Sequence, residues 1–116
     1  MNVINHTMLP RHLGEGCCSQ TVADAALCQA PFEVQVLHID AGAATDEAEQ
    51  AQARVVVVLA GSGKLLVDGG PQRFAAPCTL LIPAGARHRF VNNAAARMQL
   101  VAVSPAPAAA EEEFPS

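Results

Sequence analysis

The sequence predicts an all-β fold, a sandwich or barrel of short strands. Apolar segments with a two-residue period or a run of β-branched residues recur between residues 32 and 104, which is typical of strands. Glycine and proline turns separate these segments at short intervals and leave no room for crossover helices. A length of 116 residues fits a single domain.

The first thirty residues are the least regular part of the sequence. Pro10, Gly14 and Gly16 interrupt any long helix before residue 16. Residues 19–27 fit either a short strand or one helical turn. We expect residues 1–30 to form an N-terminal segment, either an edge strand or a strand exchanged in a dimer.

The next segments contain the clearest strand signals. Residues 32–39 read F-E-V-Q-V-L-H-I, an alternation that predicts a half-buried strand. Residues 43–53 are rich in Ala, Glu and Gln, so propensity predicts a helix, and a loop leading into the next strand is the alternative. Residues 54–60 contain four consecutive valines, for which we expect a strand buried on both faces.

The second half of the chain continues as strands and turns. Gly61-Ser62-Gly63 predicts a tight turn. Strands are predicted at residues 64–68, 72–74, 79–82, 88–91 and 97–104. In the last of these, Met98, Leu100 and Ala102 alternate with their neighbours and should share one face. We expect residues 31–104 to form the barrel and residues 105–116 to be a low-complexity tail.

Composition and charge exclude several classes of partner. The formal net charge is −4, and three of the acidic residues lie together at 111–113. The chain has no Trp or Tyr and no basic stripe, which argues against nucleic-acid binding. No apolar run approaches the ~20 residues that span a bilayer, and the N-terminus lacks the pattern of a signal peptide. We therefore expect a cytoplasmic protein with no membrane partner.

The cysteines carry no metal or disulfide pattern. There are four of them, Cys17, Cys18, Cys28 and Cys78, and no C-x-x-C pair. In a reducing compartment they are expected to be free thiols. The sequence assigns no role to the adjacent pair Cys17-Cys18.

Residues 83–92, P-A-G-A-R-H-R-F-V-N, form the most specific pattern in the chain. Four positions match the second sequence motif of the cupin family, G-x5-P-x-G-x2-H-x3-N: Pro83, Gly85, His88 and Asn92. Pro77 stands where that motif begins with glycine. The chain resembles a small single-domain cupin of the cupin 2 conserved-barrel type over residues 32–104. The resemblance implies a double-sheet jelly-roll β-barrel.

The first cupin motif, G-x5-H-x-H-x3-E-x6-G, keeps only its framework. Gly42 and Gly61 stand at its two ends. In family members that bind Fe, Mn, Ni or Zn, the two His and the Glu of this motif join the His of the second motif. Here those positions are Ala48, Gln50 and Arg54. Ala48 offers no lone pair, Gln50 offers one weak neutral donor, and Arg54 carries a positive charge. We therefore expect no standard metal site and no cofactor.

His88 and Arg54 are the main candidate site residues. The motif places His88 in the barrel cavity, as a ligand-binding group, a weak base or a remnant ligand; the alternative is a core histidine bound to a backbone carbonyl. If Arg54 points inward, it would suit a carboxylate or phosphate. The alternative is an arginine in solvent or paired with Glu47 or Glu49.

Gln50 and Phe90 complete the predicted ligand-binding set. Gln50 is expected either to hydrogen-bond a ligand or to cap its loop. Phe90 lies two residues from His88 and therefore faces the same side of the strand, where it either lines the cavity or packs in the core.

Three hypotheses for the site follow. The first is a barrel that binds a small molecule, anionic if Arg54 faces the cavity, without metal. The alternative is a metal-dependent enzyme of the dioxygenase or sugar isomerase type, in which His88 would be joined by acids of the loop, Asp46, Glu47 or Glu49, and by His38. A metal-free epimerase would need a second titrating group facing His88. The resemblance also implies a homodimer, whereas neither the ligand nor any catalysis can be named from the sequence.

Overall fold

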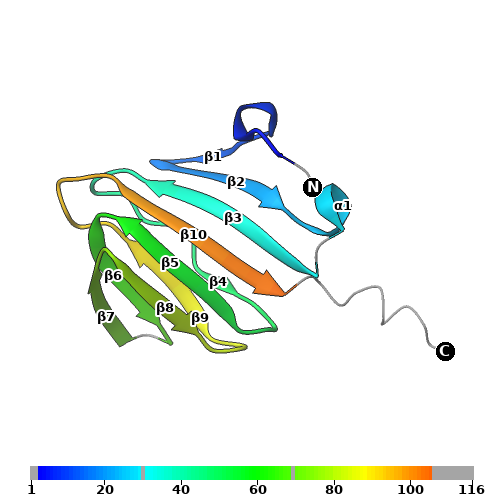
Figure 1. The fold of residues 1–116 in the computed structure, drawn as a ribbon. Helices are drawn as coiled ribbons and strands as arrows, with labels where there is room; N and C mark the ends of the chain where they lie inside the picture. Colours follow the sequence, from blue (N-terminus) through cyan, green and yellow to red (C-terminus); the bar gives the residue numbers. More distant parts are fainter. Residues whose placement is uncertain (1–2, 30, 69, 106–116) are drawn as a thin grey trace.

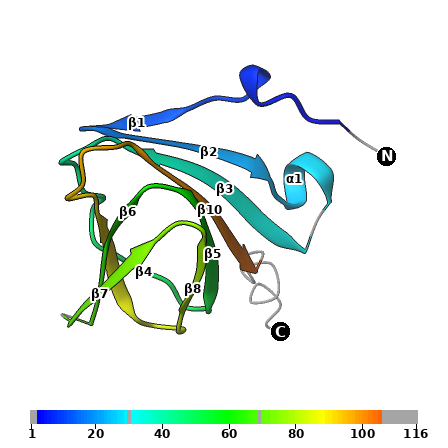
Figure 2. The ribbon, with the colours of Figure 1, turned by 60° about the vertical axis from the view of Figure 1, so that its left-hand side comes forward.

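The computed structural model describes residues 3–29, 31–68 and 70–105. Over these residues the chain forms two antiparallel sheets that curve toward each other (Figure 1 and Figure 2). The strand order is β1-β2-β3-β10-β5-β8 in the six-stranded sheet and β4-β9-β6-β7 in the four-stranded sheet. This arrangement confirms the predicted all-β jelly roll.

The strands have the following bounds. The six-stranded sheet contains β1 (His12–Gly14), β2 (Cys17–Ala23), β3 (Phe32–Ile39), β5 (Arg54–Ala60), β8 (Cys78–Ile82) and β10 (Met98–Pro105). The four-stranded sheet contains β4 (Ala48–Glu49), β6 (Ser62–Val67), β7 (Gly70–Ala75) and β9 (Arg87–Val91). Two short helical segments, η1 (His6–Met8) and α1 (Ala25–Cys28), lie near the N-terminus. None of the described helices has the length and apolar character to cross a bilayer.

The N-terminal segment extends the six-stranded sheet at its edge. β2 pairs with β3, and β1 pairs with β2 on the outside. Gln20 of β2 is 8% exposed, and its Nε2 donates to the carbonyl oxygens of His6 at 2.8 Å and Leu9 at 3.4 Å. These bonds tie η1 to the sheet. Residues 19–27 contain both predicted alternatives, because the chain leaves β2 and enters α1 within them.

Residues 43–53 form a loop with one short strand, so the helix that propensity predicts is wrong and the loop alternative is correct. The backbone of this loop bonds to β9 instead of to itself. Thr45 N donates to Phe90 O at 2.9 Å, and Asn92 N donates to Ala43 O at 2.9 Å. Such tertiary hydrogen bonds override a local helix preference.

The core lies between the sheets and is aliphatic apart from Phe90. Its buried members are Ile39, Val56, Val58, Leu65, Ile82, Ala86, Phe90, Met98, Leu100 and Ala102. The predicted shared face of Met98, Leu100 and Ala102 is confirmed. The prediction that the strand at residues 54–60 is buried on both faces is wrong. Val56 is fully buried, whereas Val55 is 38% exposed and Leu59 is 52% exposed. The second sheet covers only one side of β5, and the valines of the other side face outward.

The predicted tight turn at Gly61-Ser62-Gly63 is reduced to Gly61, because β5 ends at Ala60 and β6 begins at Ser62. Asn92 and the cysteines also have clear positions. Asn92 is fully buried, and its Nδ2 donates to the carbonyls of Ile39 and Ala96, both at 2.9 Å. Its role is therefore to hold the turn after β9. The described thiols are free and half-buried: Cys17, Cys18 and Cys78. The side chain of Cys28 and the predicted tail from residue 106 lie outside the described residues.

Candidate functional site

A cavity of about 210 Å³ lies between the sheets. Strands β3, β5 and β9 and the 43–53 loop supply its walls. The lining residues are Gln35, Leu37, Thr45, Asp46, Ala48, Gln50, Arg54, His88 and Phe90. All four predicted ligand-binding residues are among them, and they come from segments up to 40 positions apart in the sequence: Gln50, Arg54, His88 and Phe90.

A direct contact between Arg54 and His88 forms the centre of the cavity wall. Arg54 Nη1 lies 2.9 Å from His88 Nε2. A guanidinium can only donate, so Nε2 accepts and the ring proton is on Nδ1, which lies 3.3 Å from Ala86 O. His88 is 2% exposed and neutral in this arrangement. Burial lowers the pKa of His88; the contact with Ala86 opposes this shift, and the charge of Arg54 adds to it.

Arg54 is a buried cation with an incomplete set of partners. The residue is 7% exposed, and besides His88 it contacts Gln35, whose Oε1 accepts from Nη2 at 3.5 Å. Its Nε has no hydrogen-bond partner, and no carboxylate of the described residues forms an ion pair with it. Burial lowers the pKa of Arg54, while the charge of Glu33 acts in the opposite direction.

The alternative in which Arg54 faces solvent or pairs with a loop acid is therefore wrong. Glu47 and Glu49 lie instead near Arg87, each at 3.8 Å, with side chains 58% and 57% exposed. Both acids point outward, because Ala48 between them lies opposite His88 and shares its inward face, and successive side chains of a strand alternate.

The remaining cavity residues hold the His88 ring and the loop in place. The Phe90 ring meets that of His88 edge-on, with centroids 6.0 Å apart and an interplanar angle of 83°, so these two residues share a face as predicted. Gln50 Oε1 accepts from Ser104 Oγ at 3.5 Å, and the Gln50 carbonyl accepts from Gly85 N at 2.7 Å. Gln50 thereby joins the loop to the Pro-x-Gly turn before His88.

Sequence reasoning missed Gln35, which the structure places against Arg54. The signal was present in the alternation of β3, since Gln35, Leu37 and Ile39 have the same phase. His38 has the opposite phase and lies on the outer face of the six-stranded sheet, opposite Gln99 and Cys18. The fold therefore does not place His38 beside His88.

Comparison with known proteins agrees with this architecture. The family model described as "Cupin domain" matches residues 35–104, more than half of the chain. The chain belongs to the cupin family. No curated protein matches the sequence of this cupin.

Solved structures share the fold of this cupin at low identity. A cupin 2 conserved-barrel protein from Salinispora arenicola has a TM-score of 0.79 at 24% identity, covering 98% of this chain and 95% of that one. A polyketide cyclase from Streptomyces resistomycificus has a TM-score of 0.79 at 17% identity, covering 92% and 80%. A sugar phosphate isomerase from Silicibacter pomeroyi has a TM-score of 0.76 at 21% identity, covering 91% and 76%. These similarities establish the fold, and the varied activities show that the fold does not select one.

The donor set of this cupin cavity does not fit a divalent metal. Among the described residues, no three His, Cys, Asp or Glu side chains are grouped to hold an ion. The Nε2 lone pair of His88 already accepts from Arg54, and the guanidinium would repel a cation placed there. Of the residues that a rebuilt site would use, Glu47, Glu49 and His38 face other directions. Asp46 lines the cavity with His88, but among the described residues no third ligand group joins these two.

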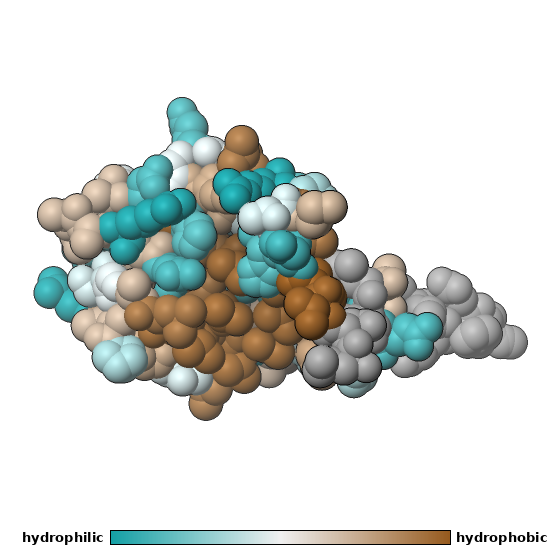
Figure 3. Space-filling view, turned by 45° about the horizontal axis from the view of Figure 1, so that its top comes forward, coloured by the Kyte–Doolittle hydropathy of each residue, from teal (hydrophilic) through white to brown (hydrophobic). Residues whose placement is uncertain are grey.

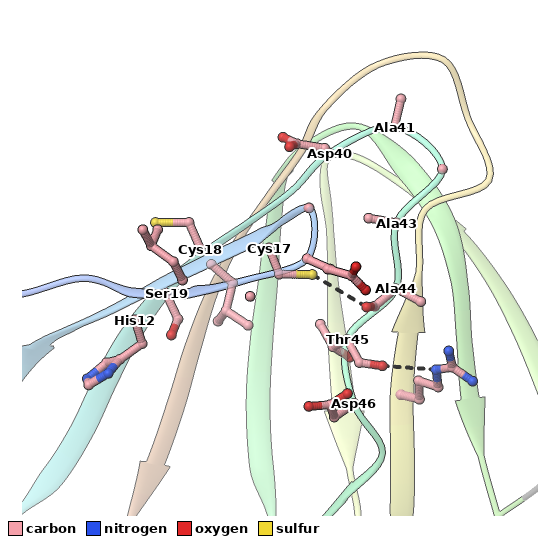
Figure 4. Close-up of a pocket in the computed structure, with 17 residues that line it drawn as sticks. His12, Cys17, Cys18, Ser19, Asp40, Ala41, Ala43, Ala44, Thr45 and Asp46 are labelled. Atoms are coloured by element: carbon pink, nitrogen blue, oxygen red, sulfur yellow. Dashed lines mark hydrogen bonds between the residues drawn. The ribbon is translucent and has the colours of Figure 1, made fainter.

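A second and larger hollow adjoins the cavity. This groove, of about 960 Å³, lies between the β1–β2 hairpin and residues 40–46, and it shares Leu37, Thr45 and Asp46 with the cavity. Figure 4 shows Cys17 and Cys18 on one side and Asp40, Thr45 and Asp46 on the other. Cys17 Sγ donates to Ala44 O at 3.5 Å. Burial, then the charges of Asp40 and Asp46, raise the pKa of Cys17, so its thiol stays protonated and is a poor nucleophile.

Proposed function

We propose that this cupin binds a small carboxylate in the barrel cavity through Arg54, without a divalent metal. The observation that carries the proposal is the Arg54 guanidinium, which is 7% exposed, has no acidic partner among the described residues and has a free Nε. A buried charge without a counterion is unfavourable. A bound carboxylate would supply the missing negative charge and accept from the Nη hydrogens that the contacts with His88 and Gln35 leave over.

The cavity surroundings match such a ligand in chemistry and size. Carboxylates accept parallel hydrogen bonds from the planar guanidinium, and the side chains of Gln35 and Gln50 offer further amide groups at the wall. The volume of about 210 Å³ holds about seven non-hydrogen atoms if each takes roughly the 30 Å³ of a water molecule. The ligand is therefore a small organic acid.

Calorimetric titration tests this proposal with acetate and propionate, with propionamide as the neutral analogue. We expect the acids to bind and the amide not to bind. Arg54→Met should abolish binding, whereas Arg73→Met, which removes the same charge from an exposed site on β7, should leave it unchanged. Equal binding of propionate and propionamide, or binding that survives Arg54→Met, would contradict the proposal. Phosphate serves as a further probe, and its tighter binding would identify a different anion class.

Metal content separates this proposal from the metal-dependent alternative. Elemental analysis of protein purified without a histidine tag should find much less than one Fe, Mn, Ni, Co or Zn per chain. A stoichiometric metal that disappears in His88→Gln would establish the rebuilt site, and the assays would then be those of oxygenases and isomerases.

We also propose that a second copy of the chain covers the outer face of the six-stranded sheet. Cross-strand neighbours on this face are aliphatic, and Figure 3 shows a continuous hydrophobic area on this side of the molecule. Its residues are Val34, Val36, Val55, Val57, Leu59, Leu81, Val101 and Val103. Leu81 is 75% exposed and Leu59 52% exposed. An exposed aliphatic face, with no Asp, Glu, Lys or Arg among the residues just named, suits its own copy across a twofold axis.

Light scattering during size-exclusion chromatography tests this assembly. We expect a dimer for the unaltered chain and a monomer for Leu81→Glu, because the introduced carboxylate would be buried at the contact. Gln72→Glu is the control, since Gln72 is exposed on β7 of the four-stranded sheet, away from this face. A monomer of the unaltered chain at micromolar concentration would overturn the proposal.

A further inference from the structure

Asp46 stands at the junction between the cavity and the groove. It lines both hollows and is exposed. None of the described residues forms an ion pair with its carboxylate. The neighbouring acid on the groove wall differs, because Asp40 contacts Arg97 at 3.6 Å. A cavity of about 210 Å³ thus has a buried cation in its wall and an unpaired carboxylate at its opening.

Two further observations describe how the two charges are held. Arg54 donates from Nη1 to His88 and from Nη2 to Gln35. Its Nε is buried without a hydrogen-bond partner among the described residues. The Asp46 loop is held by its own bonds to β9: Arg89 Nε donates to Thr45 O at 2.9 Å, and Phe90 N donates to Thr45 Oγ1 at 3.0 Å. The loop backbone therefore presents Asp46 at a defined place.

We infer that the ligand is a small zwitterion, a short amino acid whose carboxylate contacts Arg54 and whose ammonium contacts Asp46. This inference rests on the proposed function and names its ligand class. The two charges of such a molecule complement the two charges of the site. The size limit of about seven non-hydrogen atoms admits glycine, β-alanine and 4-aminobutyrate.

Other small molecules fit the charges of the site less well. A simple carboxylate pairs with Arg54 and leaves Asp46 unused. A dicarboxylate or a phosphate brings a second negative charge toward Asp46, and like charges at a site disfavour binding. The groove beyond the opening adds Glu15 and Asp40 against Arg89, which extends the preference for a positive group.

Matched pairs of ligands test the inference by calorimetry or by NMR titration. The pairs are glycine with acetate, β-alanine with propionate and 4-aminobutyrate with butyrate, and malonate, which has seven non-hydrogen atoms, serves as the dianion. In the best-fitting pair we expect the amino acid to bind about tenfold more tightly than the plain acid, as one hydrogen-bonded charge contact at a partly exposed site would give. Malonate should bind more weakly than either member of that pair.

Variants of the loop assign the preference to one residue. Asp46→Asn should remove the preference for the amino acid without weakening the plain acid, and Asp46→Lys should shift the preference to malonate. Glu47→Gln is the matched control, because this neighbouring acid contacts Arg87 at the surface and does not line the cavity; it should keep the preference. Circular dichroism checks that each variant is folded.

The outcomes separate this inference from the proposed function. If neither member of any pair binds, the proposed function fails and the inference fails with it. If both members of every pair bind equally, the carboxylate site stands and the zwitterion is refuted. If the preference survives Asp46→Asn, the assignment to Asp46 is refuted.

Discussion

Lowering the pH should destabilise this protein through His88. The side chain is 2% exposed, accepts a hydrogen bond from Arg54 at Nε2 and has a pKa below the ordinary histidine value, with burial as the main cause. Because the pKa of His88 is lower in the folded protein, the unfolded chain takes up this proton at a higher pH than the folded protein does as the pH falls. The stabilising contribution is therefore complete above about pH 6.5 and is lost as the pH falls toward the folded-state pKa.

The magnitude follows from proton linkage. In the window below about pH 6.5, one proton taken up only by the unfolded chain lowers the free energy of unfolding by about 1.4 kcal/mol per pH unit. Protonation of Nε2 would also oppose the Arg54 donor in a buried site, so the folded protein cannot accept the proton without moving the guanidinium.

Urea unfolding at about pH 7.5, 6.5 and 5.5 measures this slope. His88→Gln should flatten it, and the difference between the two curves isolates His88 from the carboxylates. His38→Gln is the matched control: burial and the charges of Arg97 and Arg11 lower the pKa of His38, with Asp40 opposing, but His38 lies on the partly exposed outer face. Its effect on the slope should be smaller.

NMR of the imidazole nitrogens provides a second test of the same reasoning. Near pH 7.5 we expect His88 to carry its proton on Nδ1, because Nε2 accepts from a group that can only donate. Parallel unfolding curves for the unaltered chain and His88→Gln, or a proton observed on Nε2, would refute the proposed pairing of His88 with Arg54.

Three further substitutions test the packing around the site. Arg54→Met should leave the free energy of unfolding unchanged or raise it by about 1 kcal/mol, since it removes a buried charge with an orphan Nε; a loss above about 2 kcal/mol in urea unfolding would contradict this. Gly63→Ala should destabilise by about 3 kcal/mol or more, because a Cβ there would overlap Val91 O and Met98 Cε, whereas Gly14→Ala, with no atom within 4 Å of the added Cβ, should be nearly neutral. Asn92→Ala should cost about 2–4 kcal/mol, because three hydrogen bonds of a fully buried side chain are lost, and a thermal-unfolding midpoint close to that of the unaltered chain would contradict it.

Local pattern alone was sufficient for the fold class and for most strands. The alternation at residues 32–39 predicted β3 with its observed bounds, and every strand predicted from residue 64 onward is present with its ends moved by at most two residues. Strand pattern is readable in this way because successive side chains point to opposite faces. The shared face of His88 and Phe90 follows from the same geometry and was also predicted.

Tertiary structure decided what local pattern does not encode. Residues 43–53 have helix-forming composition, yet their backbone groups pair with β9, which is about 45 positions away. The valines of β5 indicate a strand, but only the position of the second sheet leaves Val55 exposed and Val56 buried.

The candidate site shows the same division. The sequence by itself named His88, Arg54, Gln50 and Phe90 as candidates, because the motif spacing marks positions along strands. It left open whether Arg54 faces solvent, a loop acid or the cavity. That choice depends on which groups lie within a few ångströms after folding, and here the nearest is His88, 34 residues away at 2.9 Å. Burial between the sheets then favours a neutral histidine and leaves an arginine without a counterion among the described residues.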